Sequence, residues 1–342
     1  MTQDKNRRVI LTTRATGLPT PELFTIIEDS IPTIEDGQIL LKNIYISADP
    51  GMKGWISKAK NYASVETGST MSSFGVGVVI KSQNSNVNEG DYFVANTGWQ
   101  DYSVITPDDP GTRKIDPSVG PLSAFLGVLG HSALTAYFGL LDIGQPSAGE
   151  TVLVSTAAGS VGSAVGQIAN IKGCRTIGIT GGKEKSRLCT EEFGFDSAVD
   201  YKSTQDLEKE LKDASPNGYD VYYDNVGGKT LDIVTGLMNQ NGRIVICGTA
   251  ATEEWLPPPT GMRLERQILI SRLQIKGFIL FDFRERYEDA LSDIYQWFKN
   301  GKLNYKEDIS DGLEKAPSAL SGLYRGENTG RCLIRVNPDP TL

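Results

Sequence analysis

The chain has 342 residues, of which 39% are hydrophobic and 22% are charged, and its formal net charge is -8. At ~100–200 residues per domain this length suggests about two domains, and the composition is that of a globular protein. The acidic balance disfavours nucleic-acid and anionic-membrane partners. No apolar run reaches the ~18 residues of a membrane span, and the first residues lack the apolar core of a secretory signal, so we expect a cytoplasmic protein.

The N-terminal third of the chain is rich in turn residues and is expected to be mostly β-structure. Candidate strands, separated by Gly, Pro and Asn, are residues 8–12, 23–28, 38–46, 74–82, 91–96 and 101–105. Several short strands with such punctuation are typical of all-β architectures. The pattern favours a small, partly open β-barrel.

From about residue 127 the pattern changes to alternating strands and helices. Strands are expected at 151–155, 175–180, 197–200, 219–225, 242–247 and 274–280. Helices are expected at 132–141, 161–171, 184–193, 206–214, 229–238 and 284–300. This alternation predicts a doubly wound parallel sheet, the Rossmann type of α/β fold. A last strand at 330–336 is expected to return to the N-terminal barrel.

The stretch 151–170, TVLVSTAAGSVGSAVGQIAN, is the strongest single motif. An apolar, β-branched run is followed by small residues and then by a helical pattern. Glycines in such a turn let the backbone approach a pyrophosphate, and the N–H groups that begin the helix hold its charge. Ala157 replaces the first glycine of the usual G-x-G-x-x-G pattern, so the motif alone fits an ordinary tight turn equally well.

The charges after the second strand of this unit distinguish between the two nicotinamide cofactors. An NAD site has an Asp or Glu at that strand's tip, which bonds the ribose 2′-hydroxyl. Here the strand ends in glycines at 181 and 182, and Lys183, Lys185 and Arg187 follow. Cations pair with a 2′-phosphate, so the sequence favours NADPH. The alternative is an ordinary solvated helix start.

Metal ligands are scarce in this chain. The cysteines stand singly, and His131 is the only histidine. A zinc site needs three or four ligands drawn from Cys, His and carboxylates, and a structural site usually needs clustered cysteines. We therefore expect a metal-independent protein in which the cysteines are small buried hydrophobes. These cysteines are Cys174, Cys189, Cys247 and Cys332.

Short motifs along nearly the whole chain resemble those of the zinc-independent medium-chain dehydrogenase/reductases. They are NRR at 6–8, SADP at 47–50, GWQDY at 98–102, LTAYFGLLDIGQP at 134–146, GSVG at 159–162, YDNVGG at 223–228, QIKGF at 274–278, DGLE at 311–314 and NTG at 328–330. The nearest branch holds prostaglandin reductases, alkenal double-bond reductases and bacterial curcumin reductases. The resemblance implies a GroES-like barrel over 1–126 and 313–342, a Rossmann NADPH-binding domain over 127–312, and a homodimer.

The resemblance also implies cofactor contacts at matched positions. Those at the pyrophosphate are Gly159, Ser160, Val161 and Gly162. Those at the 2′-phosphate are Lys185 and Tyr201. Those toward the nicotinamide are Asn225, Cys247, Gly248, Thr249, Phe278, Ile279, Leu280 and, on the returning segment, Asn328. Each of these residues also has a plausible structural role.

The reaction implied by the resemblance is hydride transfer from NADPH to the β-carbon of an α,β-unsaturated ketone or aldehyde, followed by protonation at the α-carbon. Such a site must stabilise a developing enolate oxygen. The relatives typically read Asp-Pro-Tyr-Met-Arg-Gly where this chain has a glycine, Gly51, in place of the tyrosine. A second tyrosine, expected shortly after the Cys-Gly turn, is also missing. Tyr62 and His131 are candidate replacements for the proton donor, and solvent is a third.

Two other functions remain open at this point. An NADPH:quinone reductase would take a flat acceptor and would need no proton-donating tyrosine, which suits Gly51. A protein that binds the cofactor but turns over little substrate would need neither tyrosine, which suits the loss of both. The substrate of any of the three would be a small molecule.

Overall fold

The computed structural model describes residues 5–342, which form two compact units. The first unit contains residues 5–127, 307–328 and 332–342, and the second contains 128–306 and 329–331. The sequence placed the domain boundaries at 126/127 and 312/313. Compared with these boundaries, residue 127 and residues 307–312 fall in the first unit, and residues 329–331 fall in the second. The boundaries of the two functional domains remain a prediction.

The first unit is built on a seven-stranded sheet in the order β14-β15-β3-β4-β5-β7, with β6 paired to β3. Its strands are β3 (Ile39–Ser47), β4 (Phe74–Ser82), β5 (Tyr92–Asn96), β6 (Tyr102–Ile105), β7 (Arg113–Ile115), β14 (Glu307–Asp311) and β15 (Arg331–Arg335). A two-stranded sheet adds β1 (Lys5–Leu11) and β2 (Phe24–Ser30), and the helices are α1 (Met52–Ile56) and α9 (Ala316–Arg325). The C-terminal strand does return to this unit, because β15 pairs antiparallel with β3.

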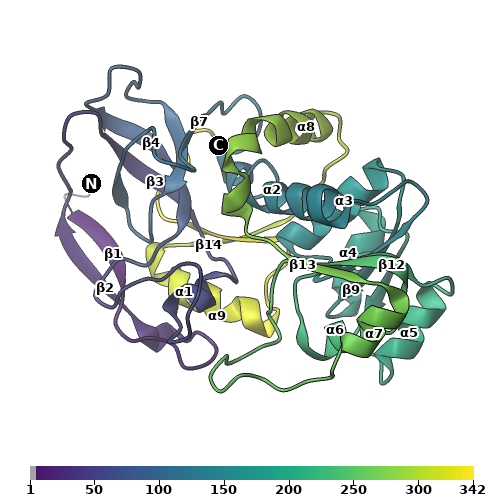
Figure 1. The fold of residues 1–342 in the computed structure, drawn as a ribbon. Helices are drawn as coiled ribbons and strands as arrows, with labels where there is room; N and C mark the ends of the chain where they lie inside the picture. Colours follow the sequence, from purple (N-terminus) through teal and green to yellow (C-terminus); the bar gives the residue numbers. More distant parts are fainter. Residues whose placement is uncertain (1–4) are drawn as a thin grey trace. The chain divides into compact units, whose positions relative to one another are not determined.

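The β3–β4 pair is bent where glycine allows close approach. The register shifts between Asn43 and Tyr45 of β3, and Figure 1 shows the two strands side by side. A Cβ on Gly77 of β4 would lie 2.6 Å from the Lys42 carbonyl oxygen. The glycine thus serves the curvature of the barrel, as expected for a glycine inside a strand.

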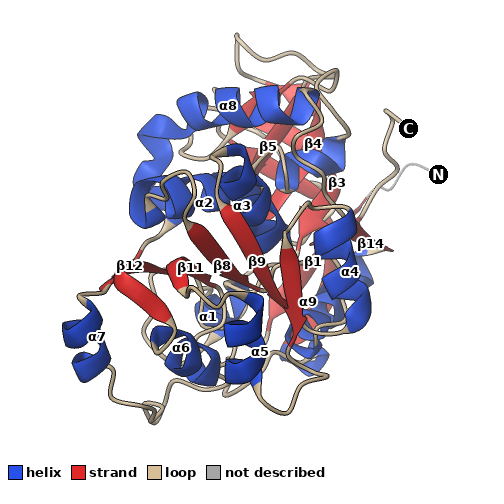
Figure 2. Cartoon of the chain, turned by 90° about the vertical axis from the view of Figure 1, so that its right-hand side faces the viewer, coloured by secondary structure: helices blue, strands red, loops and turns tan. Residues whose placement is uncertain are grey.

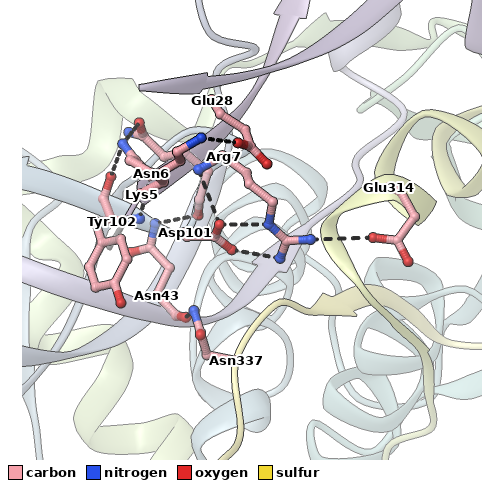
Figure 3. A network of polar contacts seen from close by, with 10 residues as sticks. Lys5, Asn6, Arg7, Glu28, Asn43, Asp101, Tyr102, Glu314 and Asn337 are labelled. Carbon is pink, nitrogen blue, oxygen red and sulfur yellow. Dashed lines mark hydrogen bonds and ion pairs between the residues drawn. The ribbon is translucent and has the colours of Figure 1, made fainter. Parts of the chain in front are cut away.

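A buried ion pair ties several of the family motifs together in this unit. The Asp101 side chain is fully buried, and its carboxylate accepts from Arg7 Nε at 2.8 Å and from the Arg7 terminal nitrogen at 3.0 Å. The same guanidinium lies 3.7 Å from the Glu314 carboxylate. Figure 3 shows Arg7 between Asp101 and Glu314. Asn6 joins the network by accepting from the Tyr102 amide at 2.9 Å. The motifs at 6–8, 98–102 and 311–314 therefore hold the fold of the barrel.

The second unit is built on a six-stranded parallel sheet in the order β10-β9-β8-β11-β12-β13. Its strands are β8 (Thr151–Ser155), β9 (Arg175–Thr180), β10 (Ser197–Asp200), β11 (Tyr219–Asp224), β12 (Met238–Ile246) and β13 (Gln274–Gly277). Counted from β8 this order is 3-2-1-4-5-6, that of the doubly wound dinucleotide-binding fold. The prediction of a Rossmann-type sheet is confirmed.

Helices flank this sheet on both faces. They are α2 (His131–Phe138), α3 (Ser160–Ile171), α4 (Lys183–Glu191), α5 (Leu207–Ala214), α6 (Gly228–Thr235), α7 (Glu265–Ser271) and α8 (Tyr287–Lys299). Figure 2 shows α2 and α3 on one face and α5 and α6 on the other. Val165, Ile168 and Ala169 of α3 are fully buried, so these side chains form the apolar face by which the helix packs.

Helices α2 and α6 end earlier than the sequence predicts. The helix expected at 132–141 ends at Phe138, and a π-helical turn follows over Gly139–Gly144 before Gln145 turns left-handed at a φ of 45°. The helix expected at 229–238 ends at Thr235, and β12 already begins at Met238 rather than at residue 242. A left-handed Asn241, at a φ of 63°, lies inside that strand, and such a local irregularity is not visible as a change of period.

Candidate cofactor site

The loop between β8 and α3 has the geometry of a phosphate-binding turn. Thr156 is left-handed at a φ of 55°, and its carbonyl accepts from the Gly159 amide at 2.9 Å. A Cβ on Gly162 would lie only 2.3 Å from the same carbonyl oxygen, so the helix can start this close to the loop only with glycine there. The first N–H groups of α3, on Ser160, Val161 and Gly162, have no partner within a helix by geometry. A helix start of this geometry can bind an anion, and a pyrophosphate contact here stays a prediction.

Tyr201 lies against the glycine turn after β9, where the 2′-phosphate is expected. A Cβ on Gly181 would be 3.0 Å from the Tyr201 hydroxyl and 3.2 Å from Lys202 Cε. Lys202 therefore approaches the tip of β9 beside Tyr201, a contact that the sequence reasoning missed. The only feature of the sequence that pointed to Lys202 is that it directly follows Tyr201. Lys185 is half-buried in the first turns of α4, which follows the same glycines.

The acidic groups near this turn are already engaged. Burial would raise the pKa of Asp200, but N–H donors from Gly182 and Lys202, at 2.7 and 3.0 Å, bring that pKa below its ordinary value. The carboxylate therefore shapes the turn. Glu184 lies 3.3 Å from the Arg187 guanidinium. The turn thus keeps a cationic side chain, Lys202, next to a tyrosine hydroxyl, a set that suits a phosphate.

The carboxyl ends of β8 and β11 are fastened together by side chains. Asn225 donates from its amide nitrogen to the Ser155 carbonyl at 2.7 Å, and its backbone N–H donates to Ser155 Oγ at 2.8 Å. The fully buried Asp224 accepts from Tyr222 and from the amides of the turn that follows. Asn225 thus lies at the carboxyl edge of the sheet, where cofactors bind in folds of this type, and its contact with the nicotinamide stays a prediction.

The residues expected around the nicotinamide come from two neighbouring strands. The Cys247 amide continues β12 by donating to the Asp224 carbonyl at 2.8 Å. Burial raises the pKa of the Cys247 thiol to about 11, so it stays protonated at neutral pH. Phe278 follows β13 and packs on Gly139, where a Cβ would be 2.6 Å from its ring. Gly248 and Thr249 follow Cys247 directly, and Ile279 and Leu280 follow Phe278.

Asn328 immediately precedes the residues that touch the phosphate loop. The Gly330 amide donates to the Ala158 carbonyl at 3.1 Å, and Gly330 bridges to Gly159 in parallel fashion. The motif Asn-Thr-Gly at 328–330 was the signal for this segment, but its pairing partner was not foreseeable from the sequence.

In the first unit, Gly51 and Tyr62 lie against each other. A Cβ on Gly51 would be 3.1 Å from the Tyr62 hydroxyl oxygen, and the Tyr62 side chain is 53% exposed. Tyr324 packs beside them, since its hydroxyl donates to the Pro50 carbonyl and the Lys53 ammonium lies 5.5 Å from its ring centroid. A phenol from position 62 therefore occupies the space that a side chain at position 51 would enter.

His131 opens helix α2 in the second unit and is partly buried. Its carbonyl accepts from Thr135 Oγ1 at 2.7 Å. Cys174, Cys189 and Cys332 are buried, as expected, whereas Cys247 is only partly buried. Within residues 5–342, no group of three or more His, Cys, Asp or Glu side chains is placed to hold a metal ion. In the same range, no helix is long and apolar enough to cross a membrane.

The fold and the loop after β8 define a dinucleotide-binding protein, and comparisons with known proteins specify the family. Residues 7–114 match the N-terminal domain of oxidoreductase, and residues 160–296 match the zinc-binding dehydrogenase model. The chain is 40% identical to the NADPH-dependent curcumin reductase of Escherichia coli (strain K12), covering 98% of this chain and 99% of that protein. It is 38% identical to the NADP(+)-dependent 2-alkenal reductase of Nicotiana tabacum, covering 97% and 98%.

A solved structure agrees with these sequence matches. The crystal structure of CurA in complex with NADPH from Vibrio vulnificus superposes with a TM-score of 0.91 at 39% identity, covering 97% of this chain and 100% of that one. The chain belongs to the medium-chain dehydrogenase/reductase family, in the branch of these double-bond reductases.

Proposed function

We propose that this protein is an NADPH-dependent reductase of the carbon–carbon double bond in α,β-unsaturated ketones and aldehydes. The use of NADPH is supported by the phosphate loop at 156–162 and by Tyr201 and Lys202 at the tip of β9. The substrate half is supported by relatives at about 40% identity named as curcumin and 2-alkenal reductases. The protein would act in the cytoplasm.

Different residues of the second unit are proposed to hold the two ends of the cofactor. The amides of Ser160, Val161 and Gly162 would hold the pyrophosphate, and Lys185, Tyr201 and Lys202 would hold the 2′-phosphate. At the other end of the cofactor, the turns at 247–249 and 278–280, with Asn225 and Asn328, would enclose the nicotinamide. When bound, NADPH supplies the hydride. The chain's part is to hold the cofactor and the enone in register and to exclude water.

Tyr62 is our proposed proton donor to the α-carbon. A phenol is a hydrogen-bond donor, so its hydroxyl can also stabilise negative charge that develops on the substrate oxygen. The support is its place beside Gly51 on an exposed surface of the first unit. His131 is the other candidate named from the sequence. The activity of His131→Gln is therefore to be compared with that of Tyr62→Phe.

The experiment that tests the function is NADPH consumption with an alkenone, a 2-alkenal and a small quinone, each with product analysis. The proposal expects the saturated ketone or aldehyde from the first two. Turnover with the quinone alone would favour the quinone reductase alternative instead. Tight NADPH binding without turnover on any acceptor would favour the cofactor-binding protein.

A homodimer is a further part of the proposal. Among the described strands, β13 pairs only with β12, so its other edge is open. Ile275 on this strand is 36% exposed, and Leu269 and Ile270 on α7 are 75% and 47% exposed. An open edge strand flanked by exposed apolar residues is a template for pairing with a second chain. Sedimentation of the native protein should show a dimer, and Ile275→Lys should shift it toward the monomer; a native monomer would end the dimer proposal.

A further inference from the structure

The phosphate loop of the second unit is held in place from outside by a strap, residues 329–331. The Gly330 amide donates to the Ala158 carbonyl at 3.1 Å, and the next amide, that of Arg331, donates to the Lys306 carbonyl at 2.8 Å. Two consecutive amides of the strap thus bond to the loop on one side and to the chain at residue 306 on the other. The strap lies between them as a parallel bridge to Gly159.

Gly330 is the residue that makes this close approach sterically feasible. Its φ is 71°, a left-handed conformation that side chains rarely adopt. A Cβ there would lie 2.0 Å from the Lys306 carbonyl oxygen and 2.5 Å from the carbonyl carbon. Both atoms belong to the backbone and cannot rotate away. Any larger residue at 330 must therefore push the strap away from residue 306 or the loop away from the strap.

The segment 304–306 is itself tied to α3 and to Glu192 at the end of α4, so it cannot yield easily. The Asn304 amide donates to Gln167 Oε1 at 2.6 Å, and Gln167 Nε2 donates back to the Asn304 carbonyl at 2.9 Å. The Asn304 side chain donates to the Glu192 carbonyl at 3.0 Å, and the Lys306 ammonium lies 2.8 Å from the Glu192 carboxylate. These bonds fasten the segment 304–306 along the helix whose first amides face the proposed pyrophosphate site.

The space between these parts is nearly filled. A cavity of about 10 Å³, lined among others by Ser160, Ser163, Lys306 and Arg331, remains between the helix start and the strap. That volume is about the size of one water molecule, so there is no room for the loop to relax inward. The loop, the strap and the segment 304–306 form one packed layer.

We propose that Gly330 is a positioning residue for the cofactor's pyrophosphate, acting through the Ala158 carbonyl on the loop that begins α3. The inference rests on the proposed NADPH site and adds a residue to which no cofactor role has been given. Gly330 does not touch the phosphate in this account. It sets the position of the loop whose amides do, and charge-assisted hydrogen bonds weaken steeply when the donors are misplaced.

The test compares two ligands on Gly330→Ala. NADPH uses the pyrophosphate loop and the 2′-phosphate turn, whereas adenosine 2′-phosphate uses only the turn at Gly181. The proposal expects the Kd for NADPH to rise by about 10- to 100-fold. The Kd for adenosine 2′-phosphate should stay within about twofold of wild type. A matched control is Gly301→Ala, because Gly301 has a φ of 66° and nothing within 4 Å of its Cβ position.

A second variant tests the positioning role without adding a side chain at residue 330. It replaces Gly330→Ala in the experiment if that variant does not fold. Gln167→Met keeps the volume but removes both bonds to Asn304, and it should weaken NADPH in the same selective way by a smaller factor. An unchanged NADPH Kd in the folded variants, or an equal loss for both ligands, would overturn the positioning role. Failure of the wild-type protein to bind NADPH would instead overturn the proposed function.

Discussion

Removal of the Lys185 ammonium tests the 2′-phosphate site. Lys185 is half-buried in the first turns of α4, directly after the glycine turn against which Tyr201 packs. In Lys185→Ala the positive charge and its hydrogen bonds are lost, but the helix is preserved, because alanine is a better helix former than lysine. The change should therefore weaken only ligands that carry the 2′-phosphate.

The size of the effect follows from the site's exposure and from the neighbouring cation. A hydrogen bond to a charged group contributes about 1.5–3 kcal/mol, and partial solvent exposure puts this one at the lower end. Lys202, whose Cε lies near the same turn, remains to pair with the phosphate. We expect a loss of about 1.5 kcal/mol, which corresponds to an approximately tenfold rise in the Kd for NADPH. The double variant with Lys202→Ala should lose more.

The assay is a fluorescence titration of wild type and variant with NADPH and with NADH. NADH lacks the 2′-phosphate, so its Kd should not change. Lys183→Ala is a matched control, because Lys183 lies on the same helix two positions from Lys185, and side chains at that spacing do not face each other. An equal loss for NADPH and NADH, or the same loss in the control, would refute a specific phosphate contact.

Three further substitutions test other parts of the account. Tyr62→Phe removes the proposed proton donor and should lower kcat by about 100-fold, with the Kd for NADPH unchanged; kcat equal to wild type would return the protonation step to solvent. Glu150→Gln should cost about 1 kcal/mol of unfolding free energy at neutral pH, since the Arg243 guanidinium, 2.5 Å away, lowers the pKa of that carboxyl. A depressed folded pKa contributes stability above the ordinary carboxyl pKa and loses it as pH falls, so denaturation curves should converge near pH 3 and below. Gly166→Ala should destabilise the second unit by about 1–3 kcal/mol, because its Cβ would lie 2.0 Å from the Phe195 ring, and Phe195→Leu should recover part of that loss in thermal melts.

The sequence predicted the strands of the second unit best. Strands β8, β9 and β10 begin and end at the expected residues, because each is a short apolar run bounded by turn residues. The short elements were missed. Helix α1 has five residues and β7 has three, too few for either period to be recognised. Helix α9 and strand β14 also lay in a stretch for which no element was predicted.

The geometry of the candidate cofactor site was predictable where residues that are neighbours in sequence are also neighbours in space. The phosphate loop and the helix after it form one continuous stretch, so their relation could be read from 151–170. Lys202 depends on how the turn at Gly181 folds, and Gly330 depends on a pairing with a distant part of the chain. Neither relation has a local signature. The nearness of Tyr62 to Gly51 likewise comes from the fold of a loop, although both residues were named from the sequence.

The most direct test of the proposed reaction uses NADPH labelled with deuterium at the reactive C4 position of the nicotinamide. The protein reduces an alkenone with this cofactor, and the product is examined by NMR. The account predicts a saturated ketone with deuterium on the former β-carbon and a solvent-derived proton on the α-carbon. An allylic alcohol with deuterium on the former carbonyl carbon would contradict it, as would recovery of unreacted alkenone from a protein that binds NADPH.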